Sequence, residues 1–180
     1  MQPMFEALLD LLKAPVSSHR GVKTDNSVLL VYPPDKELDF REQLRDSFLP
    51  ALAAQKVPCK TLDLAGFLFE GLREEEIEAL EEDEFDDYPW MLRGLARRVE
   101  GSLQGRLVDL AAQNPGGNLL LYGTLSLFPL IRFGEVLRDL RDLDCRLVLA
   151  FPGEERGGRL HFMNHLDGGN YLAIKLFWRA

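Results

Sequence analysis

The chain has 180 residues, of which 46% are hydrophobic and 28% are charged, and its formal net charge is −8. These proportions are close to those of soluble globular proteins and argue against a disordered or fibrous chain. Ten of the 29 acidic residues lie between residues 74 and 87, and because no basic stripe is present, we expect no direct binding of nucleic acid. The length predicts a single domain over residues 1–180.

Apolar runs in the sequence predict neither a leader peptide nor a membrane span. Glu6 and Asp10 interrupt the first apolar run, which lacks a basic start, so we expect no signal peptide. The longest other apolar stretch, residues 119–131, is shorter than the roughly 20 residues that cross a bilayer. Cys59 and Cys145 form no CxxC motif, and we interpret them as reduced core thiols. These features predict a cytoplasmic protein without membrane contact.

The first half of the chain alternates between helical and strand-like patterns. An amphipathic helix is predicted within residues 1–15, where it either caps the core or docks on a partner; its apolar face has Met4, Leu8, Leu11 and Leu12. The following elements are a buried strand over 27–34, a helix over 36–55 that Pro50 bends, a strand over 57–64 and a helix from 65 into the acidic segment 74–87.

The second half continues this alternation. We predict a helix over 90–112 with Leu92, Leu95, Ala96, Val99, Leu103 and Leu107 facing inward and Arg93, Arg97 and Arg98 facing outward. A strand over 118–123, a helix over 129–143 with Pro129 near its first turn, and a strand over 145–153 come next. Two last strand-like runs, separated by Asp167-Gly168-Gly169, predict a hairpin.

This order of elements predicts an α/β fold. We expect a three-layer, mostly parallel sheet with a C-terminal antiparallel hairpin, Rossmann-like or P-loop-like but without a Walker motif. Three loops, which follow Tyr32, Tyr122 and Phe151, would then lie at one edge, where parallel sheets bind their ligands.

Charged residues of these loops leave two alternatives open. Asp35, Glu154 and Glu155 could together hold Mg²⁺ through their carboxylate oxygens, and Arg132 could clamp a phosphate or a carboxylate. Alternatively, Arg132 is partly buried and pairs with Asp35, Glu154 or Glu155, which would tie two loops together.

Catalytic and metal-binding motifs are missing from the sequence. The turn after Tyr122 matches no glycine-rich phosphate loop, and Ser126 lacks the flanking glycines of a nucleophile elbow. On a strand, His161 and His165 would lie about 13 Å apart, too far to share one metal ion. We therefore assign no catalytic residue, no metal ligand and no cofactor.

Four segments resemble the BrxB family of bacterial BREX (bacteriophage exclusion) defence systems. They are LLVYPPDKELDFREQL, LLLYGTLSLFPLIRFGEVLRDL, RLVLAFPGEERGGRLHF and GNYLAIKLF. With the strand-end loops, they define a candidate functional or structural cluster of Tyr32, Pro34, Asp35, Arg41, Gly123, Pro129, Arg132, Pro152, Gly153 and Glu154, and Asn170 and Tyr171 also match the family pattern. The chain departs from that pattern at Glu155-Arg156-Gly157 and at Tyr171-Leu172-Ala173.

The resemblance implies membership of a phage-resistance operon that includes an alkaline-phosphatase-like PglZ protein, a large ATPase and a DNA methyltransferase. It implies an assembly factor that contacts the PglZ-like component, and no established catalytic activity. A non-catalytic adaptor is thus favoured over an enzyme. The alternative is a phosphate- or nucleotide-handling protein that uses Asp35, Arg132 and Glu154. The acidic segment 74–87 is either a solvated face or a surface that steers a basic partner.

Overall fold

The fold is built on a central sheet of five parallel strands. A computed structural model describes residues 1–16, 27–70, 72–75, 77–78, 88–139, 143–166 and 173–179. The strand order is β2-β3-β4-β1-β7, with bounds Cys59–Asp63, Gly117–Tyr122, Cys145–Arg156, Val28–Tyr32 and Ile174–Phe177. All neighbours in this order pair in parallel, so the predicted α/β sheet is confirmed.

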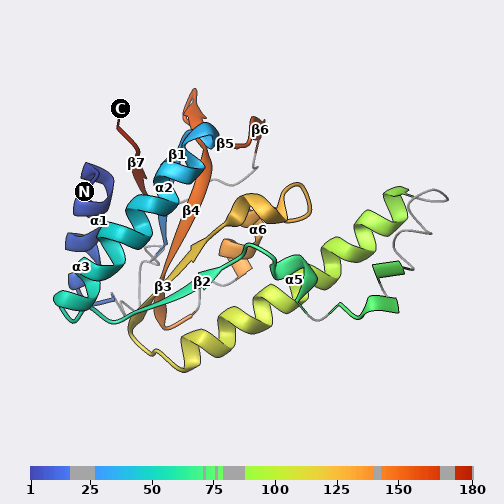
Figure 1. Cartoon of the computed structure of the whole chain (residues 1–180), viewed down its shortest axis with the longest axis horizontal. Coiled ribbons are helices and arrows are strands. Elements are labelled where there is room, and N and C mark those ends of the chain that lie inside the picture. The colour runs from blue at the N-terminus through green and yellow to red at the C-terminus, as the bar shows by residue number, and fades with distance from the viewer. Residues whose placement is uncertain are drawn as a thin grey trace.

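Helices cover both faces of this sheet and give three layers (Figure 1). One face is covered by α1 (Pro3–Lys13), α2 (Glu37–Gln43), the π-helical turn η2 (Leu44–Phe48) and α3 (Leu49–Ala54), with the short 3₁₀ turn η1 (Pro34–Lys36) before α2. The other is covered by η3 (Phe67–Phe69), α5 (Tyr88–Ala112), η4 (Thr124–Leu127) and α6 (Phe133–Asp139).

The sheet separates two apolar clusters, and β1 contributes to both. Leu29 and Val31 pack toward α5 and α6, whereas Val28, Leu30 and Tyr32 pack toward α1 and α2. All five residues of β1 are buried. A strand that is covered on both faces needs apolar residues at every position, which explains the uninterrupted run VLLVY.

The N-terminal helix caps the core, as one of the two sequence-based alternatives proposes. Five of its side chains are buried against the sheet: Met4, Phe5, Leu8, Leu9 and Leu12. Its C-terminal carbonyl groups are bound by Arg146 of β4, which donates to the oxygens of Leu11 (2.8 Å) and Ala14 (3.2 Å). Helix packing and this hydrogen-bonded terminus together fix α1 on the sheet.

The predicted helix over 36–55 is interrupted by a π-helical turn. Pro50 has no N–H group, and its ring would clash with the carbonyl group of residue 46 in a regular α-helix. Residue 46 lies inside η2, so a π-helical turn, which is wider than an α-helical one, comes directly before the helix that contains Pro50. The buried side chains of this segment are Phe40, Leu44, Phe48 and Leu52. Leu38 of the same segment is 79% exposed.

The helix predicted from residue 65 is not formed at its start. Gly66 adopts a left-handed conformation with φ of 82° and the 3₁₀ turn η3 follows it, whereas residues 74–75 and 77–78 are helical. The Asp63 carboxylate accepts a hydrogen bond from the Ala65 N–H group at 2.9 Å, which favours a turn over a helix. Most of the acidic segment 74–87 lies outside the described residues, and of its carboxylates only Glu74, Glu75 and Glu78 are described as exposed.

Helix α5 matches its predicted range, but only part of it is covered. Val99, Leu103, Leu107 and Ala111 are buried, and the N-terminal part projects beyond the sheet (Figure 1). Leu92, Leu95 and Ala96 are half-buried rather than inward. Two aromatic residues of this projecting part, Tyr88 and Trp90, are exposed.

The C-terminal part contains the antiparallel hairpin, but between other strands than the sequence suggests. Strand β4 continues beyond the parallel sheet and pairs in antiparallel fashion with β5 (Arg159–Phe162), which pairs with β6 (His165–Leu166). Strand β7 does not join this hairpin, because it lies parallel to β1 at the sheet edge. Its described partner is β1, and the turn predicted at residues 167–169 lies outside the described residues.

Candidate functional site

The carboxyl ends of the parallel strands meet at one edge, as predicted. Tyr32 at the end of β1 is in register with Pro152 of β4, and Asp63 of β2 with Tyr122 of β3. In open α/β sheets this edge has the crevice in which ligands bind. Here β4 runs 12 residues and continues out of the sheet between the ends of β1 and β3. The strand itself therefore occupies the usual position of the crevice.

Five side chains form a polar network at this edge, which we call the edge network: Tyr32, Glu37, Arg41, Asp63 and Tyr122. The Tyr32 hydroxyl donates to Glu37 Oε2 at 2.6 Å, and Arg41 Nε donates to Glu37 Oε1 at 2.7 Å. Arg41 also lies 3.8 Å from Asp63 Oδ1 and 5.9 Å from the centre of the Tyr122 ring. The network thus connects β1 and α2 to the ends of β2 and β3.

Burial and charge shift the titration of this network. Burial, with the Glu37 carboxylate beside it, raises the pKa of the Tyr32 hydroxyl far above its ordinary value. For Arg41, burial acts to lower the pKa, but the hydrogen bond and the charge of Glu37 outweigh it and raise the pKa. Burial and the nearby Asp63 raise the pKa of Tyr122. Both tyrosines therefore stay neutral at physiological pH and act as hydrogen-bonding and packing groups.

The turn after β3 is fixed by backbone geometry and two hydroxyl groups. Gly123 has φ of 70°, which permits the reversal predicted from the sequence. A Cβ atom there would lie 2.6 Å from both Arg41 Nη2 and Asp63 Oδ1. Thr124 Oγ1 donates to the carbonyl oxygen of Ala150 at 2.8 Å, and Ser126 Oγ lies 2.6 Å from that of Leu64. Ser126 is bound to backbone oxygens, so it is a turn residue in this conformation.

The charged loop residues of the predicted cluster do not come together. Asp35 is exposed in η1, and Pro34 beside it is half-buried. Glu154 forms an ion pair with Arg156, and Glu155 pairs with Lys175 of β7 at 2.7 Å. Among the described residues, Asp35, Arg132 and Glu154 make no ion pair with one another.

Pro152 and Gly153 are buried where β4 leaves the parallel sheet. A Cβ atom at Gly153 would lie 2.1 Å from the backbone oxygen of His161 in β5. Glycine is therefore required for the close approach of these two strands. His161 and His165 lie on different strands, with His165 opposite Phe162, so the two histidines do not act as one metal-binding pair.

Arg132 is exposed, and it does not tie the strand-end loops together in the described part of the chain. The helix predicted to begin near Pro129 begins at Phe133 instead. Residues 128–130 form a turn, and the Arg132 carbonyl accepts the N–H groups of Glu135 and Val136 as the first hydrogen bonds of α6. Pro129 and Arg132 line a surface hollow of about 190 Å³ with residues of the β5–β6 hairpin. The remaining two predicted positions, Asn170 and Tyr171, lie outside the described residues.

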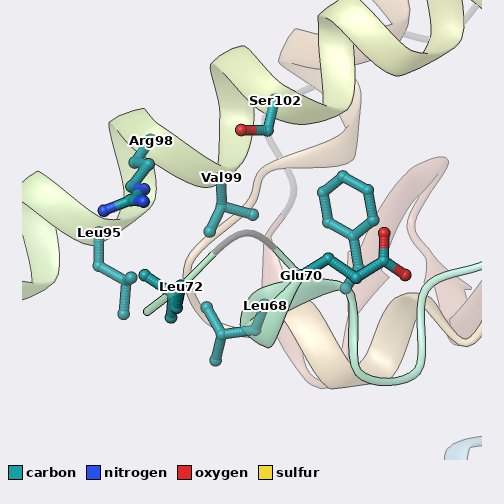
Figure 2. A pocket seen from close by; sticks show the side chains of 8 residues that line it. Leu68, Glu70, Leu72, Leu95, Arg98, Val99 and Ser102 are labelled. Atoms are coloured by element: carbon teal, nitrogen blue, oxygen red, sulfur yellow. The ribbon is translucent and has the colours of Figure 1, made fainter. Parts of the chain in front are cut away.

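A second, much smaller hollow of about 10 Å³ lies between η3 and α5. Figure 2 shows Leu95 and Val99 of α5 projecting toward Leu68 and Leu72, with Glu70 pointing away from them. Its volume is about that of one water molecule, so it is a seam between two packed segments rather than a binding site.

Sequence reasoning missed Glu37, Asp63 and Arg146. Glu37 and Arg41 have the i, i+4 spacing of a helical ion pair, a signal that could have identified Glu37. Asp63 ends β2, whose loop is not among the three loops that the sequence places at this edge. Arg146 lies in an apolar strand and is 8% exposed, and nothing in the sequence indicates that a helix terminus packs against it.

Neither metal ligation nor thiol chemistry is suggested by the arrangement of the described residues. Within the described ranges, His, Cys, Asp and Glu side chains form no group of three suited to hold a metal ion. Both cysteines are free, and burial raises the pKa of the Cys59 thiol to about 12 and that of Cys145 to about 11. In the same ranges, no helix combines the length and hydropathy needed to span a bilayer.

A family model described as BREX protein BrxB matches residues 61–176, more than half of the chain. The chain belongs to the BrxB family. The matched range contains α5, β3, α6, β4, β5, β6 and most of β2 and β7, and it includes Gly123, Pro129, Arg132 and Gly153. No curated protein and no solved structure matches the chain. Membership of this family makes the protein a component of BREX antiphage defence.

Proposed function

We propose that the protein is a non-catalytic adaptor that assembles a BREX complex in the cytoplasm by contacting a PglZ-like protein. The observation that supports this proposal is how the carboxyl edge of the sheet is filled, because an α/β enzyme would have its reaction centre there. There, Tyr32, Glu37 and Arg41 bind one another, and the extension of β4 occupies the crevice.

The exposed surface supports the same proposal. Exposed apolar surface is common at sites of protein association. Tyr88 and Trp90 on the projecting part of α5, Phe69 in η3 and Leu166 in β6 are all at least half exposed. These four residues lie within the range that matches the BrxB family. The ATPase and the methyltransferase of the same system are further candidate members of the complex.

The test is a pull-down of the tagged protein from its native host, with the co-eluting proteins identified by mass spectrometry at 50 and 300 mM salt. We expect a stoichiometric PglZ-like protein in the eluate. If the acidic segment steers this partner, the yield falls at the higher salt concentration. A protein that elutes alone at both concentrations contradicts the adaptor function.

The alternative function, handling of a phosphate or nucleotide, has its own readout. A nucleotide present at 100 times its dissociation constant stabilises a protein by about 2.7 kcal/mol. We expect no change in melting temperature on addition of Mg²⁺ with ATP or GTP. A clear rise would favour the alternative, particularly if Arg132→Ala abolished it.

A further inference from the structure

The hollow beside Arg132 combines an apolar floor with a basic rim. It opens between the turn of residues 128–132 and the β5–β6 hairpin. Phe128, Ile131 and Phe162 contribute its apolar surface. Arg132 and His165 contribute its ionisable groups, and Leu166 lines it next to His165. All of these residues fall within the family-matched range.

The floor of the hollow is formed by packed side chains and is therefore largely preorganised. Ile131 is 5% and Phe162 is 4% exposed. The Phe162 ring lies 5.1 Å from that of Phe151 and 5.6 Å from that of Phe133, measured between ring centres. Phe128 lies against Phe162 and against the ring of His165, at 6.0 and 5.2 Å. A group that enters the hollow would not have to order these side chains.

The rim carries positive charge in a strongly acidic protein. Among the described residues, no aspartate or glutamate lines the hollow, although the whole chain has a net charge of −8. Arg132 is exposed and forms no ion pair within the described residues, whereas Arg41, Arg45 and Arg156 each have a carboxylate partner. The hollow is thus complementary to an apolar group that has a carboxylate beside it.

The size of the hollow selects the kind of occupant. Its volume of about 190 Å³ is below the 300–1,000 Å³ that is typical of small-molecule and cofactor sites. It is close to the volume of a cavity, about 150 Å³, that takes up benzene. One aromatic ring or one leucine side chain therefore fills it, and a nucleotide does not fit.

We propose that this hollow receives a single phenylalanine-, tyrosine- or leucine-type side chain of the partner protein, whose neighbouring Asp or Glu contacts Arg132. This inference rests on the proposed function, because its occupant is a segment of the protein that the adaptor binds. A large apolar anchor in a desolvated pocket with an arginine at its rim is the arrangement that dominates the binding energy of many interfaces.

The first experiment measures the affinity of the purified full-length chain for the purified PglZ-like protein by calorimetry at 100 mM salt. Two variants alter the hollow at exposed positions, Leu166→Asp and Arg132→Glu. The matched controls are Leu38→Asp and Arg45→Glu, which make the same changes of residue type on the opposite face of the sheet. Both residues are exposed there. These controls lie outside the family-matched range.

We expect each hollow variant to weaken binding at least about 10-fold and each control to change it less than about 2-fold. All four variants should keep the melting temperature of the wild type, because none removes a buried group. Hollow variants that bind like the wild type, or controls that lose as much affinity, would overturn the inference.

A second experiment tests the hollow without the partner. The peptide acetyl-Glu-Phe-Asp-amide is titrated into the ¹⁵N-labelled chain, with acetyl-Lys-Ala-Lys-amide as the control. We expect the first peptide to shift the amide signals of Arg132, His165 and Leu166 and the second to leave them unchanged. If the wild-type chain does not bind the PglZ-like protein, the proposed function fails, and this titration decides the hollow by itself. Absence of shifts with the first peptide overturns the inference.

Discussion

At the amino end of the sheet Arg146 is buried and, among the described residues, binds neutral oxygen atoms, whereas at the carboxyl end Arg41 is half-buried and binds carboxylates. Arg146 donates to two carbonyl groups of α1 and to Asn118 Oδ1, and Asn118 donates to Pro58 O at 2.9 Å. Burial lowers the pKa of Arg146. The comparison shows that a buried guanidinium can hold a helix terminus through the dipoles of neighbouring carbonyl groups, and that ion pairs are used where water still screens the charges.

The largest effect is expected at the amino end. Arg146→Ala removes the donor of the Ala14 carbonyl oxygen and of Asn118 Oδ1, and one of two donors of the Leu11 carbonyl oxygen, which keeps the Ala14 N–H group. Each such group costs about 1–3 kcal/mol, which is partly offset because the guanidinium no longer has to be desolvated. We expect a loss of about 3–4 kcal/mol in the free energy of unfolding, measured with urea. Arg156→Ala, on the exposed end of β4, is the control and should cost below about 1 kcal/mol.

Gly123→Ala should have the largest effect at the carboxyl end. The substitution places a side chain in a left-handed backbone conformation and within 2.6 Å of Arg41 Nη2. We expect a loss of about 2–3 kcal/mol, since both the backbone and Arg41 must move. Gly94→Ala is a matched control, because nothing lies within 4 Å of its Cβ position in α5, and it should leave stability equal or up to about 1 kcal/mol higher. Equal effects of the two substitutions would contradict the strain at Gly123.

Tyr32→Phe removes one hydrogen bond of the edge network and nothing else. Its hydroxyl donates to a carboxylate, and such bonds contribute about 1.5–3 kcal/mol. We expect a loss of about 1.5–2 kcal/mol at pH 8, measured by urea unfolding. A neutral result would mean that the edge network does not contribute to stability.

The same variant tests the raised pKa of Tyr32. The hydroxyl ionises in the unfolded chain near its ordinary pKa of 10.0 but stays protonated in the folded chain. Raising the pH above 10 therefore stabilises the unfolded state relative to the folded state. The wild type should lose up to about 1.4 kcal/mol per pH unit from this group, and Tyr32→Phe should show a shallower decline between pH 9.5 and 11. Cys59 and Cys145, whose pKa values are also raised, are present in both proteins and cancel in the difference.

The smallest effect is expected for Asp63→Asn. The carboxylate lies 3.8 Å from Arg41 Nη2, and both side chains reach solvent. Asparagine can still accept the Ala65 N–H group, so only the screened ion pair is lost. We expect a change below about 0.5 kcal/mol, measured at 50 and 300 mM salt. A loss above about 2 kcal/mol would show that this end of the sheet is as tightly coupled as the other.

How far the sequence predicts this molecule depends on the range of the interactions. The buried strands at residues 28–32, 117–122 and 145–152 are predicted because a continuous apolar run has few alternatives. The helix start at residue 65 and the pairing of β7 were wrong, since a side-chain cap at Asp63 and a strand formed more than 100 residues earlier overrule local propensity. In the predicted strand-end cluster, Tyr32 and Arg41 both donate hydrogen bonds to Glu37. Arg132 lies instead at the surface hollow, because its helix begins at Phe133.

The position of β1 between β4 and β7 has a consequence for biosynthesis. Val28 pairs with Val148 on one side and Ile174 on the other, so β1 cannot complete its pairing until β7 has been synthesised. Contacts of such long sequence separation make folding slow. The family-matched range 61–176 also contains β4 and β7 without the strand between them. A fragment limited to that range would expose two unpaired strand edges and should aggregate, whereas the first 60 residues, added in trans, would complete the sheet.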